Sequence, residues 1–559
     1  MTTESSLLPL LAVLIPFAGL FAIVATGSRP NVRETATIAT ALATLGTVAS
    51  MVPAVLQGVV PTTDLGAFVP GISLVLQADP LGMVFGLIAS FLWLVTSFYS
   101  IGYMRGLDEH SQTRYFAAFA GSIASAVGVA FAANLIVLYV FYELLTVATY
   151  PLVAHDETQE ARTAGRKYLA YTFGGGVAAL AGTALIYVAT GTVTFTPGGI
   201  TGLATADPLV GRVAFALLVV GFGVKAALMP IHSWLPDAMV APTPVSGLLH
   251  AVAVVKSGVF AIARVVLDVF GPDPMAELGL GLPLAAVAGF TIVAASVIAL
   301  RQDNLKRRLA YSTISQLSYI VLGLGLLSPA ALVGGLLHIP AHAFMKLTLF
   351  FVAGAIHVET HTDDISDMAG IGRRMPLAMI AFAVASVGMA GLPLVAGFVS
   401  KWYLLIGSLD AGQTVFVLVL LLSGLLNIGY FWPIVYQAFF QTPADADSKP
   451  VIEGPFGGKR ARADGGQAEG LAVDRNPSDH TRTESHEAPA DDHEDHAHHG
   501  GPPAGGWERR SLGAESTWFM IGPILVAATG AVVLGIDPEG AIFLQLIQQI
   551  VENATGVAF

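Results

Sequence analysis

Long apolar stretches separated by short polar loops make up most of this chain. A helix of about 20 apolar residues is long enough to cross the hydrocarbon core of a membrane. About fourteen stretches have this character: residues 7–26, 36–57, 81–104, 115–132, 134–154, 168–190, 212–230, 244–267, 280–300, 309–327, 330–356, 376–408 with a break, 414–440 and 517–536. The pattern predicts an all-α polytopic membrane protein with about 14 transmembrane helices.

Basic residues alternate between the two sides of this predicted topology. Loops that follow odd-numbered spans carry arginine and lysine, whereas loops that follow even-numbered spans carry almost none. Because positively charged loops stay in the cytoplasm, both termini are predicted to lie outside the cell. One missed or extra span would break this alternation, so it supports the number of spans. We expect a multi-pass protein of the plasma membrane.

Composition agrees with a membrane protein and excludes some chemistry. Hydrophobic residues make up 54% of the 559 positions and charged residues 12%, and the mean hydropathy is +0.69. Soluble domains are about 25% charged. Cysteine is absent, which excludes disulfides, iron–sulfur ligation and cysteine zinc sites. We predict no cofactor, no resident metal and no nucleic-acid partner.

Residues 442–516 differ from the rest of the chain in composition. They are rich in Asp, Glu, His, Gly, Pro and Ser and show no apolar periodicity, which predicts a disordered cytoplasmic insertion. Histidines between positions 486 and 499 offer ligands for a divalent metal. No rigid spacing fixes a coordination geometry, however, so a solvated acidic tether is the favoured interpretation.

Two lysines within residues 221–260 lie inside neighbouring apolar stretches. Lys225 and Lys256 are joined by a proline-rich connection. A lysine at the centre of a membrane helix costs about 2.5–3.5 kcal/mol on insertion scales. A lysine near a helix end can extend its ammonium group to the interface, and this alternative stays open. Two such lysines in adjacent helices favour an ion or proton path.

Glu143 lies near the centre of the fifth span. It is the only carboxylate between Arg114 and Asp156. An isolated carboxyl group in a membrane would be neutral, and a lysine within reach would keep it charged; Lys225 is the predicted partner. An ion pair that only joins helices is the alternative, although apolar residues would serve structure at a lower cost.

The eleventh span carries three titratable residues at a spacing of four. His338, His342 and Lys346 therefore share one face of a helix. Histidine titrates near neutral pH, so the stripe is typical of a proton relay. Structural histidines remain an alternative. Metal binding ranks last, because no third carboxylate or histidine accompanies the pair.

The twelfth span is interrupted just before a lysine. Gly391, Pro393 and Gly397 precede Lys401, and the seventh span has a lysine followed by Pro230. Interrupted helices at corresponding positions indicate inverted repeats and the ion site. The predicted divisions are the first three spans (1–114), a first five-helix repeat (115–267), a second five-helix repeat (268–441), the insertion (442–516) and the last span with its tail (517–559).

These motifs resemble the antiporter-like subunits shared by Mrp-type cation/proton antiporters, respiratory complex I and membrane-bound hydrogenases. The resemblance covers roughly residues 75–440 and is carried by FYELLTVATYPLVAH, KAALMPIHSWLPDAMVAPTPVSGLLHAVAVVK, HIPAHAFMKLTLFFVAGAI and GLPLVAGFVSKW. It implies fourteen core helices, two inverted five-helix repeats and broken helices 7 and 12. The relay residues it implies are Glu143, Lys225, His250 or Lys256 in helix 8, His338, His342, Lys346 and Lys401.

Within this family the chain is most similar to the D-type subunit of Mrp antiporters. That resemblance implies proton movement coupled to Na⁺ export, in a complex with other subunits. A proton-pumping, non-redox subunit of a complex I-like NADH-quinone oxidoreductase or a hydrogenase is the second hypothesis. A scaffold whose charges serve only assembly is the third.

Overall fold

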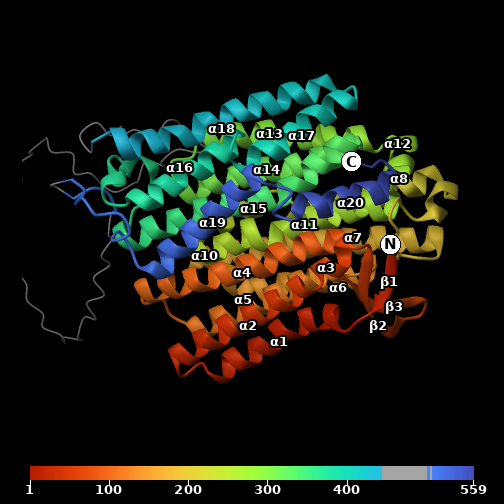
Figure 1. Ribbon diagram of the computed structural model, residues 1–559, viewed down its shortest axis with the longest axis horizontal. Coiled ribbons are helices and arrows are strands. Elements are labelled where there is room, and N and C mark those ends of the chain that lie inside the picture. The colour runs from red at the N-terminus through yellow and green to blue at the C-terminus, as the bar shows by residue number, and fades with distance from the viewer. Residues whose placement is uncertain (443–499, 504–505, 559) are drawn as a thin grey trace, which may run out of the picture.

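The computed structural model describes residues 1–442, 500–503 and 506–558, and its long helices run side by side in one bundle (Figure 1). Twelve helices in this part of the chain are long and apolar enough to cross a membrane. The remaining two of the fourteen predicted spans are interrupted helices. The predicted all-α membrane fold is therefore confirmed.

The N-terminal helices flank a small sheet that the sequence analysis did not predict. Strand β1 (Thr2–Ser5) pairs parallel to β2 (Val59–Val69), which pairs antiparallel to β3 (Ile72–Gln77). Pro70 and Gly71 form the β2–β3 turn, and Gly71 has φ +80°, which suits this two-residue connection. The first helices are α1 (Leu8–Ala25), α2 (Pro30–Ser50), α3 (Val52–Leu56) and α4 (Pro80–Gly106).

The next part of the chain contains the first interrupted span. Its helices are α5 (Gln112–Phe131), α6 (Leu135–Val153), α7 (Gln159–Thr190), η1 (Thr201–Thr205), α8 (Pro208–Lys225), α9 (Trp234–Asp237) and η2 (Ala238–Val240). Helix α8 ends at Lys225, and the turns between α8 and α9 occupy the place where the sequence predicts a broken seventh helix.

The eighth span is also irregular, which the sequence analysis did not foresee. It consists of α10 (Thr243–Gly247), a π-helical turn η3 (Leu248–Val252), α11 (Val254–Arg264) and a second π-helical turn η4 (Val265–Phe270). Every residue of these four elements is buried. π-Turns inside helices are frequent at functional sites, and this span carries both His250 and Lys256.

The remaining helices of the core are regular except for one break. They are α12 (Pro272–Glu277), α13 (Gly281–Leu300), α14 (Leu305–Leu326), α15 (Pro329–Thr360), η5 (Ile365–Asp367), η6 (Ile371–Arg373), α16 (Pro376–Ala390), α17 (Ala396–Asp410) and α18 (Thr414–Phe440). The gap between α16 and α17 is the predicted break of the twelfth span. Helix α15 is buried along its apolar length and forms the centre of the second half.

The last described segment returns to this core. Helices α19 (Trp518–Ile536) and α20 (Phe543–Thr555) both pack against α4 and α15. Residues 506–516 fall within the predicted insertion, yet Trp507 Nε1 donates to Ala369 O at 2.8 Å, and Glu515 accepts from the amides of Leu377 and Ala378. These anchors fix the end of that segment. The predicted disorder of residues 443–499 and 504–505, including the histidine-rich run, lies outside the described residues.

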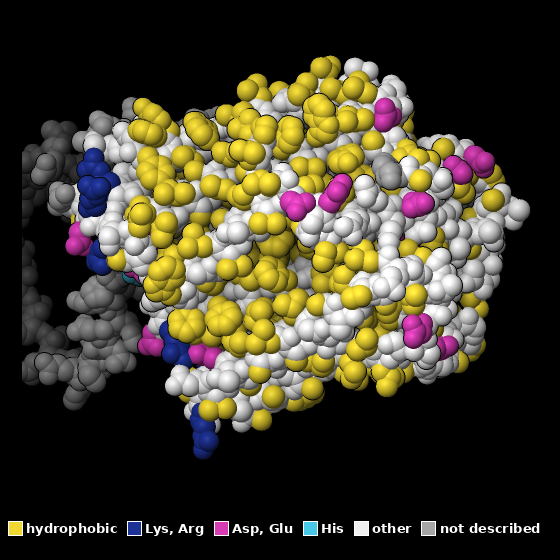
Figure 2. Space-filling model, viewed as in Figure 1, with side chains coloured by type: hydrophobic (Ala, Val, Ile, Leu, Met, Phe, Trp, Pro, Cys, Tyr) yellow, Lys and Arg dark blue, Asp and Glu magenta, His cyan; other side chains and the backbone are white. Residues whose placement is uncertain are grey.

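The surface supports a membrane setting. Figure 2 shows apolar side chains over the middle of the visible face, with Lys and Arg gathered at the left-hand end. The exposed apolar residues include Val188, Phe290 and Leu425, at 81%, 66% and 66% exposure. An apolar belt between polar ends is what a bilayer requires of a polytopic protein.

Candidate functional site

Lys225 is the last residue of α8 and is completely buried. Its Nζ atom donates to the backbone carbonyl of Tyr142 at 2.5 Å and lies 3.5 Å from the centre of the Tyr142 ring. The ring face and the carbonyl oxygen both offer partial negative charge to a cation. Helix α6, which carries Tyr142, therefore provides the immediate environment of this lysine.

Three hydrogen bonds stabilise the chain where α8 stops. Leu228 N donates to Gly223 O at 3.0 Å, Trp234 Nε1 donates to Val224 O at 2.7 Å, and Met229 N donates to Thr291 Oγ1 at 3.2 Å. Backbone groups freed by a helix break inside a membrane must be satisfied by protein or water. The break is thus a built feature that places Lys225 at a helix end inside the bundle.

Glu143 follows Tyr142 on α6 but does not form the predicted direct ion pair with Lys225. Both carboxylate oxygens are buried, and neither has a hydrogen-bond partner among the described residues. The carboxylate lies against Gly176 of α7, where an added Cβ would be 2.2 Å from Oε1. In this structure the lysine binds the carbonyl next to Glu143, so the pair is separated.

Lys256 and His342 form the direct contact at the centre of the site. Nζ of Lys256 lies 2.7 Å from Nδ1 of His342, and both side chains are fully buried. The Lys256 helix also approaches α8 closely, since a Cβ on Gly258 would lie 2.7 Å from the carbonyl carbon of Lys225. Helix α11 therefore connects the environment of Lys225 with that of α15.

His250 lies in the η3 turn and has a different environment from Lys256. Within the described part of the chain neither of its ring nitrogens has a hydrogen-bond partner, and its ring lies 4.8 Å from that of Phe350. Thr243 and Ser246, on the preceding turn, likewise have buried hydroxyls that no described residue bonds. Buried polar groups normally bind something, so η3 and α10 present a polar surface inside the core.

His338 continues the line of contacts one turn from His342. The two rings are 6.1 Å apart. His338 Nδ1 lies 2.8 Å from Ser400 Oγ on α17, and Nε2 lies 2.9 Å from Gln316 Oε1 on α14. Both nitrogens are hydrogen-bonded, so this ring is held between two helices.

Lys401 lies at the far end of the line, beside the break of the twelfth span. Its Nζ donates to Met389 O at 2.5 Å and lies 4.8 Å from the centre of the Tyr319 ring. That ring in turn stacks on His338 at 5.4 Å. Like Lys225, Lys401 therefore contacts both a backbone carbonyl near a helix end and the face of an aromatic ring.

Lys346 branches from this line toward α14. Its Nζ donates to Ser312 Oγ and, at 3.3 Å, to Leu309 O, and lies 5.6 Å from the Phe431 ring. Of the three residues predicted on one face of the eleventh span, His342 contacts α11, whereas His338 and Lys346 both contact α14. We refer to Lys256, His342, His338, Tyr319 and Lys401 as the central row.

The four buried lysines share one electrostatic property. None of Lys225, Lys256, Lys346 and Lys401 has a carboxylate within 4 Å in the part of the chain that the structure describes. A buried ammonium without a paired anion is expensive. The arrangement is therefore unlike a set of structural salt bridges and suits groups that exchange a proton with their neighbours.

Several residues of the site were not singled out from the sequence. Gln316 is a polar residue within the tenth span, and besides contacting His338 it donates to Asn427 Oδ1 at 3.0 Å. Tyr319 and Ser400 occupy ordinary helical positions, and no sequence pattern distinguishes them. One sequence signal could have been used: Arg264 lies four residues before Asp268, a spacing that places opposite charges side by side on a helix.

Arg264 organises a buried ion cluster at the end of the eighth span. It donates to Asp268 Oδ2 at 2.8 Å and to both carboxylate oxygens of Asp79 at 2.5 and 2.7 Å. Asp79 also caps α4 by accepting from Gly82 N at 2.8 Å. The cluster ties the start of α4 to the eighth span and is separate from the central row.

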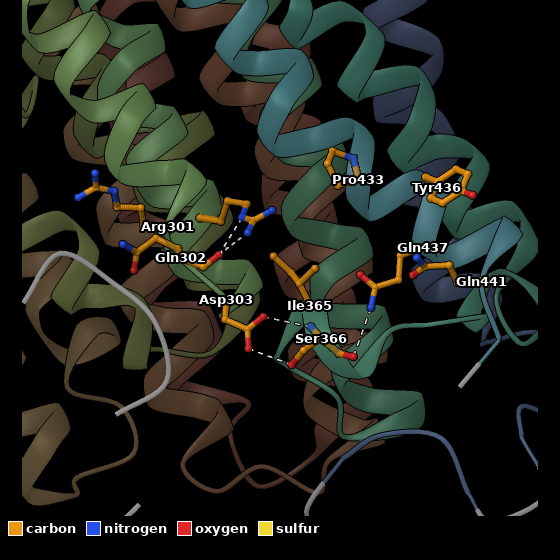
Figure 3. Close-up of a pocket in the computed structure, with 10 residues that line it drawn as sticks. Arg301, Gln302, Asp303, Ile365, Ser366, Pro433, Tyr436, Gln437 and Gln441 are labelled. Atoms are coloured by element: carbon orange, nitrogen blue, oxygen red, sulfur yellow. Dashed lines mark hydrogen bonds between the residues drawn. The ribbon is translucent and has the colours of Figure 1, made fainter. Parts of the chain in front are cut away.

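A pocket of about 220 Å³ lies between the starts of α14 and η5 and the end of α18 (Figure 3). Asp303 accepts from the amide and the hydroxyl of Ser366 at 3.1 and 2.9 Å, and Gln437 Nε2 donates to Ser366 O at 3.2 Å. These bonds join the loop after α15 to its neighbours. The pocket's lining residues include no member of the central row.

The fold and the central row together define a polytopic membrane protein with a buried series of titratable groups. Residues 132–426 match the family described as NADH:quinone oxidoreductase/Mrp antiporter, TM. This segment makes up more than half of the chain and contains the whole central row. The chain belongs to this family, as the sequence motifs indicated.

Proteins similar to this chain include both oxidoreductase subunits and antiporter subunits. NADH-quinone oxidoreductase subunit N from Desulforudis audaxviator is 36% identical over 400 residues, which are 70% of this chain and 77% of that protein. A probable K(+)/H(+) antiporter component from Rhizobium meliloti is 34% identical over 450 residues, which are 78% of this chain but 44% of that longer protein.

A solved structure shares the fold over nearly the whole length. A chain in the Mrp complex from Dietzia sp. DQ12-45-1b matches with a TM-score of 0.76 and 22% identity, covering 98% of this chain and 97% of that one. The match supports the helix arrangement. The D-type assignment within the family stays a prediction.

Proposed function

We propose that the chain is the proton-translocating membrane subunit of a multisubunit Na⁺/proton antiporter. It works with partner subunits in the plasma membrane, and it is itself a secondary transporter subunit rather than an enzyme. The observation that carries this proposal is the central row. In it, consecutive titratable or hydroxyl-bearing side chains run from Lys256 to Lys401 through the buried core without a counterion among the described residues.

The row suits proton transfer because it combines lysine, histidine and tyrosine side chains that can each donate or accept a proton, and all of them are buried. An imidazole can accept a proton at one nitrogen and release one at the other. His342 bonds Lys256 through Nδ1, and its Nε2 has no hydrogen-bond partner in the described chain. Water bridges between polar groups such as His250 and His342 would connect them, and the π-turns supply polar surface beside them.

Glu143 and Lys225 act at the entrance of this relay in the proposal. In one state the carboxylate and ammonium pair; in the other, as seen here, the lysine binds Tyr142 O. Separation leaves Lys225 free to pass charge toward Lys256, and repulsion between successive ammonium groups would drive the next step. The loops rich in arginine and lysine would face the cytoplasm and both termini the outside.

Everted membrane vesicles that contain the complete complex test the proposal. A pre-formed pH gradient is followed with a fluorescent dye, and Na⁺ is added without an electron donor. Collapse that depends on Na⁺ and is lost in Lys225→Ala supports the proposal. Lys167→Ala is the matched control, because Lys167 pairs with Asp237 at 2.6 Å and is partly exposed. Full exchange in assembled Lys225→Ala complexes contradicts the relay.

The second candidate is a proton-pumping component of a complex I-like oxidoreductase. It is favoured by the similarity to a NADH-quinone oxidoreductase subunit N over 77% of that protein. The same vesicles distinguish the two functions, since this candidate predicts no response to Na⁺ and a pH gradient that forms only when NADH or another donor is supplied. A scaffold predicts that charge-neutral variants assemble and keep full transport.

A further inference from the structure

Three side chains far from the central row converge at the basic end of the bundle. Glu109 and His110 lie in the loop between α4 and α5, and His155 lies just beyond the end of α6. One ligand atom from each lies within 4.8 Å of the others. Two imidazoles and a carboxylate are a set of ligands that binds zinc in proteins.

His155 is the buried residue of this group, and its ring nitrogens give a second, independent indication that a ligand binds here. Its side chain is 0% exposed, and neither ring nitrogen has a hydrogen-bond partner among the residues that the structure describes. Leaving a buried polar group unsatisfied costs about 1–3 kcal/mol. Its Nε2 lies 3.8 Å from Glu109 Oε2, so the unsatisfied nitrogen is directed at the other two residues.

His110 is oriented for coordination by a backbone contact. Its Nε2 lies 3.0 Å from the carbonyl oxygen of His155, so this nitrogen carries the proton and donates. The other nitrogen, Nδ1, then has a free lone pair and lies 3.8 Å from Glu109 Oε2. A ring N–H bonded to a carbonyl is the usual support of a histidine that binds a metal through its second nitrogen.

The ligand atoms must move closer together to bind an ion, most of all the two histidine nitrogens. Zinc at about 2.0–2.2 Å from tetrahedral ligands places those ligands about 3.3–3.6 Å apart. The two separations from Glu109 are 3.8 Å, and all three ligand atoms lie within 4.8 Å of one another, so the two histidines must approach each other further than either must approach Glu109. The His110 and Glu109 side chains are 50% and 20% exposed, so they can move toward the buried His155. The open side of the cluster leaves room for water as a fourth ligand.

The surroundings favour a neutral imidazole at His155. The His155 side chain is fully buried, and burial disfavours the charged imidazolium, so its ring nitrogens keep lone pairs for a ligand. Arg114 itself is engaged by Glu157 and by the His155 carbonyl. Glu109 adds a carboxylate to the two imidazoles, which supplies negative charge for a bound cation.

We propose that Glu109 Oε2, His110 Nδ1 and His155 Nε2 form a binding site for a divalent transition metal ion of the zinc class. The site joins the α4–α5 loop to the end of α6. Because α6 also carries Tyr142 and Glu143, a bound ion holds the helix on which the first relay carboxylate lies.

The test uses Co²⁺ as a spectroscopic probe on the complete purified complex after treatment with a chelator. The six histidines between positions 480 and 499 are replaced by glutamine in every protein, so that they do not compete for metal. We expect one Co²⁺ per chain with a visible d–d band, displaced by an equimolar amount of Zn²⁺. His155→Gln and Glu109→Gln should each weaken binding by at least about tenfold.

His361→Gln is the matched control, because this exposed histidine directly follows α15 and is not part of the cluster. It should keep the full affinity. Unchanged Co²⁺ stoichiometry and affinity in both Glu109→Gln and His110→Gln would overturn the proposal, and so would the absence of a d–d band in the parent protein. Those two side chains are partly exposed, so the test does not depend on the folding of His155→Gln.

Discussion

The ammonium nitrogen of Lys256 lies 2.7 Å from Nδ1 of His342, and this contact joins α11 to α15 in the centre of the molecule. One member is a proton donor in its charged form, and the other accepts at the nitrogen that faces it. The contact links the part of the site near α8 to the histidines of α15. Transport should therefore depend on Lys256 and His342 together.

Lys256→Ala and His342→Ala are each expected to lower Na⁺-driven proton exchange by about 100-fold, the typical contribution of a positioned acid or base. Because the two act as one unit, the double variant should lose little more than either single variant. Exchange in vesicles, normalised to assembled complex, measures this. Ser257→Ala, on the same buried helix, should retain exchange. A double variant whose loss equals the product of the two single losses would show that the residues act independently.

Gly176→Ala tests the position of the Glu143 carboxylate without removing it. The added Cβ would meet Oε1 at 2.2 Å, so the carboxylate must move away from α7. We expect a loss of exchange of about tenfold or more, since misplacing a reacting group by about 1 Å is costly. Gly174→Ala is the control on the same helix, because no atom of the described chain lies within 4 Å of its added Cβ. Equal activity in the two variants contradicts a role for this carboxylate.

Much of this architecture can be predicted from the sequence because hydrophobic length and loop charge are local signals. The fourteen spans, the breaks beside Lys225 and Lys401, and the shared helix face of His338 and His342 all follow from spacing. The interruption of the eighth span cannot be seen in this way, since η3 and η4 contain no proline or glycine and, apart from His250 and Asp268, only apolar residues.

Contacts between helices are the part that spacing does not determine. The separation of Glu143 from Lys225 depends on the carbonyl of Tyr142, a backbone atom that every residue possesses. Tyr319 joins the row, and Ser400 bonds His338, only because α14 and α17 both pack against α15. The ion cluster of Arg264 unites residues 185 positions apart, and only the pair four residues apart leaves a trace in the sequence.

Arg264→Gln should destabilise the protein by about 3 kcal/mol, because it leaves the buried carboxylate of Asp268 and the partly buried carboxylate of Asp79 without their cation. Thermal unfolding of the complex in detergent measures the loss. Arg264→Gln combined with Asp268→Asn should recover part of it, since one uncompensated charge is removed. Arg212→Gln is the control: that arginine donates to Leu278 O in an exposed setting and should change stability little. No recovery in the double variant would mean that packing, not charge, explains the loss.

Gly391→Ala tests whether the position of Lys401 matters separately from the break itself. Gly391 has φ +88°, and an added Cβ would lie 2.7 Å from Lys401 Cδ, so the side chain that donates to Met389 O must shift. Gly412→Ala is a matched control, because it has φ +68° and open space around its added Cβ within the described chain.

Both alanine variants impose left-handed backbone strain of about 1–2 kcal/mol, and their unfolding temperatures should fall by similar amounts. Only Gly391→Ala displaces the lysine, so only this variant should lose exchange, by about tenfold or more. Exchange and thermal unfolding measured on the same preparations separate the two effects. If both variants transport equally well, Lys401 does not need its contact with Met389 O, and the central row ends at Tyr319.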